Sequence, residues 1–226
     1  DVTLALIRLQ WWRDVLAASD AGGRTGHPVA DAVLEVVKRH GVPMSLVAAP
    51  LDASEAELAT EPLEDTAFRA YLDAAGGAAV RMAAHVLGVP AGGPADTYLA
   101  AAGRAVAATG LAVSLPFHIR CGRLPAAASV LSGLADFRSS EAAARAAVQA
   151  VTLALARIGK DNYDGARRLA AGASRGARAA ALPAALVPQY LKAVHRPGRD
   201  LVRDVPEISP LRRMWCLWLA HVGGSV

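Results

Sequence analysis

The sequence predicts an all-α protein with a single domain, and three observations support this prediction. Alanine, the residue with the highest helix propensity, is the commonest of the 226 residues, and aromatic residues make up only 5%. Apolar residues recur three and four positions apart through most of the chain, whereas strand-type alternation is nowhere sustained. The sequence contains no long Ser/Gly linker and no repeat of about 20 to 50 residues, so residues 1–226 are expected to form one helical domain.

The chain is expected to begin with two amphipathic helices, over residues 1–19 and 27–41. Pro28 suits the first position of the second helix, because a helix leaves that N–H without a partner, and Gly41 suits the residue after its end. A short helical pair is expected over residues 42–60.

A long helix is expected over residues 65–88, with Asp65 as its N-cap and Gly88 as its stop. Its interior contains Gly76 and Gly77, which together cost about 1–2 kcal/mol relative to alanine. Such a cost indicates either a close helix crossing or a ligand packed on the backbone, and the crossing is the simpler interpretation.

The second half of the chain predicts four further helices. The first covers residues 95–115 and is expected to stop at Pro116, which lacks a backbone N–H. A long helix follows over residues 139–172, with capping serines at its start. Two shorter helices are expected over residues 182–196 and 209–222.

The sequence contains none of the common phosphate-binding, zinc-protease or serine-hydrolase motifs. Its two cysteines, Cys121 and Cys216, have neither the number nor the spacing of a disulfide framework, which favours a reducing compartment. His118 and Cys121 are too few for a tetrahedral zinc site, so no metal site is predicted there. The arginines are not interleaved with aromatic residues, so no nucleic-acid partner is predicted.

Charge and hydropathy allow a membrane surface as a partner. The net charge is +4, and no uninterrupted apolar run reaches the ~18 residues of a membrane span, so the chain is expected to be soluble or peripheral. Trp215 and Trp218, in the apolar run 214–222, suit either a membrane interface or a packed core. Helix-spaced arginines suit anionic headgroups, diphosphates, an acidic protein or a solvated face: Arg167, Arg168, Arg175 and Arg178.

A tryptophan pair lies in the first predicted helix. Helical spacing places Arg8, Trp11, Trp12 and Val15 on one face. These residues could line a cavity, or form core with the arginine stem packed on an indole ring.

A stretch without carboxylates is the most unusual feature of the chain. The sequence holds 20 acidic residues, yet none lies between Asp96 and Asp136, whereas Arg104, Arg120 and Arg123 do. This pattern indicates either a core helix or a site from which carboxylates have been lost.

The chain resembles the squalene/phytoene synthase superfamily from end to end, through six segments in the family's order: RLQWWRDVL, HPVADAV, PLDASEAEL, YLDAAGGAAVRMAAHVLG, AGRAVAATGLAVSLPFHIRCGRLP and SPLRRMWCLW. The resemblance implies a single-domain isoprenoid-synthase-type helical bundle around a central cavity. It also implies a head-to-head condensation of two prenyl diphosphates, in which two aspartate-rich segments hold Mg²⁺ ions that grip the diphosphate.

In this resemblance the second aspartate-rich segment is lost. The family's asparagine and two aspartates align with Gly110, Ser114 and His118, and its usual glutamine and arginine align with Ala107 and Val113. Serine and histidine cannot replace two aspartates, because Mg²⁺ prefers anionic oxygen ligands. The first segment would precede residue 1, so we expect the chain to be an N-terminally truncated piece of a longer product.

Other positions carry the resemblance further. Asp52 and Glu57 match two acids of a family stretch and are expected to face the cavity. The run from Pro116 to Arg123 resembles the subgroup that lacks both aspartate-rich segments, typified by a mitochondrial complex I assembly factor. No residue is assigned a catalytic role, and the candidates for lining the cavity or binding a ligand are Arg8, Trp11, Trp12, Asp52, Glu57, Tyr71, Gly76, Gly110, Ser114, His118, Arg120 and Arg123.

Three functional hypotheses follow. The first is a non-catalytic peripheral membrane protein or respiratory-complex assembly protein with a cavity for a lipid or isoprenoid, on the cytoplasmic side or at the inner-membrane face, in the mitochondrial matrix if the source is eukaryotic. The second is an active prenyltransferase on farnesyl or geranylgeranyl diphosphate, with Mg²⁺ held by Asp52, Glu57 and upstream acids. The third is an unrelated binding or scaffolding role.

Overall fold

The structure is a computed structural model that describes residues 2–18, 24–58, 62–121, 126–132, 140–198, 200–201 and 204–223. These residues form helices and loops, with a single isolated bridge between Leu63 and Ala127 and no strand, which confirms the all-α prediction. The elements run in the order α1 (Val2–Ala17), α2 (Pro28–His40), α3 (Met44–Ala56), α4 (Asp65–Leu72), η2 (Asp73–Gly77), α5 (Ala78–Val86), α6 (Pro94–Arg120), α7 (Ala128–Leu131), α8 (Glu141–Leu169), η3 (Ala170–Gly172), α9 (Arg175–Ala180), η4 (Leu182–Leu186), α10 (Val187–Val194) and α11 (Pro210–Gly223).

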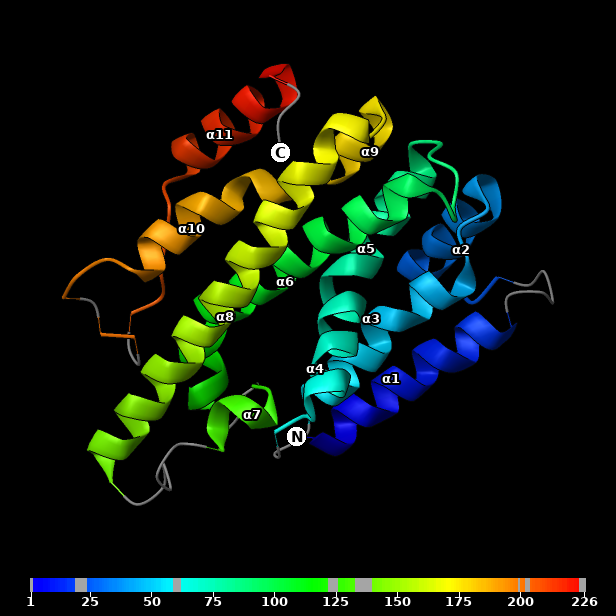
Figure 1. Cartoon of the computed structure of the whole chain (residues 1–226). Coiled ribbons are helices and arrows are strands. Elements are labelled where there is room, and N and C mark those ends of the chain that lie inside the picture. Colours follow the sequence, from blue (N-terminus) through cyan, green and yellow to red (C-terminus); the bar gives the residue numbers. More distant parts are fainter. Residues whose placement is uncertain are drawn as a thin grey trace.

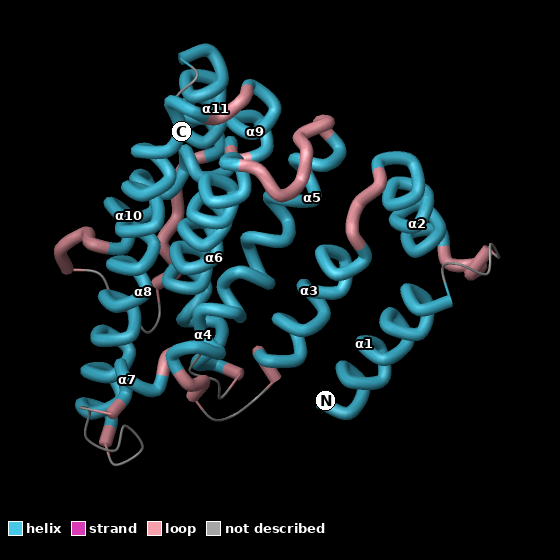
Figure 2. The backbone as a smooth tube through the Cα atoms, turned by 45° about the vertical axis from the view of Figure 1, so that its right-hand side comes forward, coloured by secondary structure: helices cyan, strands magenta, loops and turns pink. Residues whose placement is uncertain are grey.

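Helix α6 is the central element of the bundle (Figures 1 and 2). It packs along α8 on one side and against η2 on another, with α3 and α1 lying beyond η2. By length and composition α6 could span a bilayer, but 67% of its most apolar window is buried inside the bundle. Its hydropathy is therefore that of a core helix.

Local signals explain where several helices begin and end. Helix α2 starts at Pro28, the ring of His27 accepts a hydrogen bond from the Ala30 N–H, and Gly41 follows the last turn with a left-handed φ of 61°. Helix α8 starts where the hydroxyl of Ser140 accepts a hydrogen bond from an N–H of the first turn. Both starts agree with the sequence prediction to within two residues.

The prediction that Pro116 ends a helix was wrong. Helix α6 continues through this proline to Arg120, and the Cys121 N–H donates to the carbonyls of Phe117 and His118. A proline removes one N–H from the helix, and here the buried Pro116 ring packs in the core, which offsets that loss. Helix α3 likewise contains Pro50, so the predicted helical pair is one helix.

The predicted helix over residues 65–88 is divided by the π-helical turn η2, which contains Gly76 and Gly77. The helix starts at Asp65, one residue earlier than an N-cap at Asp65 predicts, because Glu64 occupies the N-cap position, and Gly88 has a left-handed φ of 73° beyond the end of α5. A π-turn inserts an extra residue into a helix and is frequent at sites of close contact or function.

Two apolar cores flank the two halves of α6. The first half packs Tyr98, Leu99 and Ala102 against α5, α9 and η4. The second half packs Leu111 and Leu115 against α3, α4 and α8.

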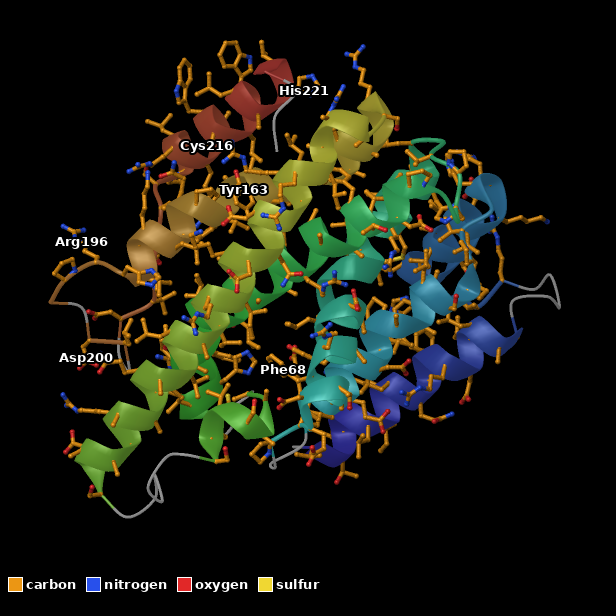
Figure 3. All side chains as sticks on the ribbon, viewed as in Figure 1. Phe68, Tyr163, Arg196, Asp200, Cys216 and His221 are labelled. Carbon is orange, nitrogen blue, oxygen red and sulfur yellow. The ribbon has the colours of Figure 1, made fainter. Side chains whose placement is uncertain are left out.

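Helix α11 lies at one edge of the bundle, and Cys216 and His221 mark it in Figure 3. It contacts η4, and within the described chain its outer face is not covered. The rings of Trp215 and Trp218 stack with centroids 5.2 Å apart, and both remain more than half exposed. The other large apolar residues exposed on this helix are Leu211, Met214, Leu219 and Val222.

Candidate functional site

The first half of α6 crosses η2 at backbone contact. A Cβ atom added to Gly76 would lie 2.2 Å from the carbonyl oxygen of Gly103, and one added to Gly103 would lie 2.4 Å from the Cα of Gly77. Real Cβ atoms do not approach backbone this closely, so the crossing requires glycine on both helices. This confirms the interpretation of Gly76 and Gly77 as a close helix crossing, and it leaves the cavity candidate Gly76 buried between the two helices.

A polar network lies one residue beyond this crossing. Arg104 donates to the Asp73 carboxylate at 2.8 Å and to the side-chain oxygen of Asn162 at 2.9 Å. Asn162 in turn donates to the carbonyl of Ile158 at 2.9 Å. The network joins η2, α6 and α8, and it was not predicted, because its members are 31 and 58 residues apart in the sequence.

The network borders a cavity of about 400 Å³ between α4, α6, α7 and α8. Its polar lining combines both charges, and Phe68, labelled in Figure 3, contributes to its apolar wall. The lining residues are Asp65, Phe68, Arg69, Leu72, Arg104, Ala127, Ser129, Val130, Ile158, Asp161 and Asn162. In the sequence, the stretch without carboxylates that contains Arg104 pointed to this part of the chain. It could not identify Asp73 and Asn162 as the partners of Arg104.

The second half of α6 carries the positions that align with the family's asparagine and aspartates. Gly110 is exposed, and a Cβ added to it would meet nothing within 4 Å. The Ser114 hydroxyl turns back to the carbonyl of Leu111 at 3.4 Å, and His118 is only 8% exposed. Arg120 is exposed at the helix end, and Arg123 lies outside the described residues.

These side chains do not fit the Mg²⁺ ions that the resemblance implies. At these positions α6 offers a part-buried hydroxyl already hydrogen-bonded to the backbone and a buried imidazole, and no carboxylate lies on this helix after Asp96. Mg²⁺ prefers hard oxygen ligands in near-octahedral geometry and is usually bound in proteins through one or two carboxylates. Across the described ranges, no group of three or more His, Cys, Asp and Glu side chains is placed to hold a metal ion.

The acids of α3 have other partners. Asp52 accepts from Arg13 of α1 at 2.9 Å, and Glu55 accepts from the same guanidinium. The hydrogen bond that Arg13 donates to Asp52 is the first cause that raises the pKa of Arg13 above its usual value. Glu57 instead accepts from the Tyr71 hydroxyl at 2.7 Å, and burial raises the pKa of that tyrosine. Asp52 and Glu57 therefore engage separate partners.

The tryptophan pair lies between α1 and α2. The rings of Trp11 and Trp12 meet edge to face at 5.2 Å, and both contact the His27 ring, at 5.1 and 5.9 Å. Trp11 is 37% exposed and Arg8 is exposed. The pair forms a partly exposed aromatic cluster with the residue that caps α2, and Arg8 lies outside it.

An all-helical bundle is the fold class that the resemblance implies. The sequence profile of the family Squalene/phytoene synthase matches residues 1–214, and the chain belongs to this family. No curated relative matches the chain at a significant level.

Solved structures confirm the isoprenoid-synthase-type fold. The chain is similar to squalene synthase HpnC from Alicyclobacillus acidocaldarius, with 17% identity, a TM-score of 0.68, and coverage of 85% of this chain and 74% of that one. It is also similar to a dehydrosqualene synthase in complex with ligand, with 16% identity, a TM-score of 0.72, and coverage of 95% and 77%.

Proposed function

We propose that this protein is a non-catalytic member of the squalene/phytoene synthase family that works at a membrane surface and keeps space for a lipid or isoprenoid ligand. The single observation that carries the proposal is the set of side chains on α6, where Gly110, Ser114 and His118 occupy the positions at which the resemblance implies an asparagine and two aspartates. Ionising a prenyl diphosphate places negative charge on the leaving group, and metal ions are its main stabiliser. Because this part of α6 carries no carboxylate, it offers no ligand for the metal ions that would stabilise the leaving diphosphate.

The proposed binding of a lipid or isoprenoid rests on the open space beside Gly110. Gly110 removes a side chain from the exposed face of α6, and Ala107 and Val113 replace longer polar residues on the same helix. This face is wider and less polar than the one that the resemblance implies. It suits an apolar chain better than a diphosphate.

The membrane part rests on α11. An exposed face with two stacked tryptophans, four further large apolar residues and the neighbouring Arg212 and Arg213 has the composition of a helix that lies in the headgroup region of a bilayer. Exposed apolar patches of this kind mark interaction sites in stable proteins. An anionic bilayer, on the cytoplasmic or matrix side, is the partner we propose.

A role in assembling a respiratory complex is the narrower form of this proposal. It rests on the resemblance of the run from Pro116 to Arg120 to the subgroup without aspartate-rich segments. Co-purification of respiratory-complex subunits with the tagged full-length protein, lost on Phe117→Ser because Phe117 is exposed, would support it. Co-purification that is unchanged by this variant would contradict a role for the run.

Catalysis is tested with the full-length protein, farnesyl or geranylgeranyl diphosphate and Mg²⁺, by measuring diphosphate release beside a known dehydrosqualene synthase. We expect no release above the uncatalysed rate. Mg²⁺-dependent turnover would instead support the alternative function, an active head-to-head prenyltransferase with a rearranged metal site. Loss of that turnover in Asp52→Asn and Glu57→Gln variants would then locate the site on α3.

Membrane binding is tested by flotation with vesicles of phosphatidylcholine, with and without an anionic phospholipid. We expect the wild type to float with anionic vesicles and a Trp215→Ser/Trp218→Ser variant to remain at the bottom. A Val86→Ser/Leu87→Ser variant is the matched control, since these residues are also exposed but lie on and just beyond α5. Equal flotation of all three proteins, or a concentration-dependent dimer lost only in the tryptophan variant, would contradict the proposal.

A further inference from the structure

A groove lies between α8 and α10, away from the exposed face of α6. It has a volume of about 990 Å³, within the range of small-molecule sites. Figure 3 shows Tyr163 on the side of α8 that faces α10. The groove residues are Leu153, Ala154, Ala156, Arg157, Lys160, Asp161, Tyr163, Asp164, Arg167, Pro188, Leu191, Lys192 and His195.

The floor of the groove is apolar and elongated. Ala154 and Ala156 on α8 leave space that larger residues would fill, and Pro188 and Leu191 form the opposite wall on α10. From Leu153 to Arg167 the groove follows α8 for roughly 21 Å, at about 1.5 Å per residue. This shape accommodates an extended hydrocarbon chain.

The rim of the groove is basic. Lys160 is paired with Asp164 at 2.6 Å, whereas Arg157, Arg167 and Lys192 have no acidic partner within 4.0 Å among the residues that the structure describes. Asp161 is the remaining acid on this rim. The unpaired cations outnumber it, so the groove favours a negatively charged group.

Two of the three unpaired cations, Arg157 and Lys192, lie at one level of the groove, and the third, Arg167, lies at its other end. Helix α10 runs antiparallel to α8 (Figure 1), so its end with Lys192 and His195 lies towards the part of α8 that carries Arg157. At the other end, with Arg167, Tyr163 is partly buried, and this burial is the main cause that raises the pKa of its hydroxyl above its usual value. The groove thus places Arg157 and Lys192 beside the alanines of α8 and Leu191 of α10.

We infer that the groove between α8 and α10 binds one amphiphile with an anionic head group, with its hydrocarbon chain along Ala154, Ala156 and Leu191 and its phosphate or carboxylate between Arg157 and Lys192. This inference goes beyond the proposed function, because it concerns a site away from the exposed face of α6 and holds whether or not that face is catalytic. A free anion would not make the apolar contacts of the groove floor. An uncharged hydrocarbon chain would not make the ionic contacts of the rim.

The test is isothermal titration of the full-length protein with dodecyl phosphate below its critical micelle concentration, beside dodecanol and inorganic phosphate. We expect one dodecyl phosphate per chain, at least about tenfold weaker binding of dodecanol, and no measurable binding of phosphate, because a charge-assisted contact and the apolar chain both contribute. Equal affinity for dodecanol would overturn the head-group assignment, and saturable binding of phosphate alone would overturn the amphiphile.

Variants locate the binding. Ala154→Phe should fill the floor and abolish binding, and Arg157→Gln/Lys192→Gln should weaken it by about tenfold or more. Arg168→Gln is the matched control, because Arg168 is exposed on the same helix beside Arg167 but does not line the groove, and it should change affinity less than about twofold. Circular dichroism melts confirm that each variant is folded. Unchanged binding by a folded Ala154→Phe protein would exclude this groove.

Discussion

The two halves of α6 differ in how tightly they are constrained. In the first half, Gly103 touches the backbone of η2, and the next residue, Arg104, is held by Asp73 and Asn162. In the second half, Gly110 faces open space and Ser114 makes only a long hydrogen bond to its own helix. One continuous helix therefore carries both a tightly packed crossing and an open face.

The difference shows that the fold and the family's chemistry depend on different residues. The crossing excludes any side chain at Gly76 and Gly103, so it fixes how α6 meets η2 and hence the bundle. The open face has no such packing role, so carboxylates can be lost from it without loss of structure. Fold alone does not establish function.

The largest effect is expected for Gly103→Ala. Its Cβ would lie 2.4 Å from the Cα and 2.6 Å from the N of Gly77, both backbone atoms that cannot rotate away. We expect the free energy of unfolding to fall by about 3 kcal/mol or more, because the two helices must separate. Urea unfolding measures this. A loss below about 1 kcal/mol would mean that the crossing is not close-packed in solution.

Removing the Arg104 network should have the next largest effect. Arg104→Gln loses an ion pair and a hydrogen bond from the guanidinium to a neutral amide oxygen, at a position where the side chains of the ion pair are about a quarter to a third exposed, so we expect a loss of about 1–2 kcal/mol. A double-mutant cycle with Asp73→Asn isolates the pair. Arg145→Gln, which removes an exposed pair within α8, is the control and should cost less than about 0.5 kcal/mol. Equal losses in both proteins would contradict a structural role for the network.

Tyr98, also in the first half of α6, should respond to alkaline pH. Its hydroxyl is buried without a hydrogen-bond partner among the described residues, and burial raises its pKa to about 12 from 10.0. The unfolded chain therefore releases this proton first, so the tyrosine's contribution is constant below pH 10 and falls as pH rises from 10 to 12.

Tyr98→Phe should flatten this fall in the free energy of unfolding. At pH 7 the variant should be as stable as the wild type or more stable by about 1 kcal/mol, because an unsatisfied hydroxyl is removed. Urea unfolding at pH 7, 10 and 11.5 measures both effects. A steeper fall in the variant would contradict the assignment of the raised pKa to Tyr98.

The smallest effect is expected for Gly110→Ala, and its sign is opposite to that of Gly103→Ala. The added methyl group meets nothing within 4 Å, so the higher helix propensity of alanine should raise stability by about 0.5–1 kcal/mol. Destabilisation by this variant would mean that the face is occupied or packed in the full-length protein.

The sequence predicted the features that are governed by neighbouring residues. Pro28, Gly41 and Ser140 mark helix ends because caps act within one turn, and the paired glycines favoured a close helix crossing as the simpler explanation of their cost in a helix. Pro116 does not end its helix, because tertiary burial of the ring offsets the lost hydrogen bond.

Features that depend on distant contacts could not be predicted. The contact from Arg104 to Asn162 joins residues 58 positions apart in the sequence. The groove between α8 and α10 depends on how these two helices pack against each other. The tryptophans of α11 suited a core or an interface equally, and only their placement at the edge of the bundle shows that they are exposed.

The central claim is that the open face of α6 cannot hold a Mg²⁺-bound diphosphate. Calorimetric titration of the full-length protein with inorganic diphosphate, with and without Mg²⁺, tests it most directly, with a dehydrosqualene synthase as the positive control. We predict no Mg²⁺-dependent binding by the wild type. Saturable binding that requires Mg²⁺ and is lost in a Gly110→Trp variant, which would cover this face, would contradict the claim.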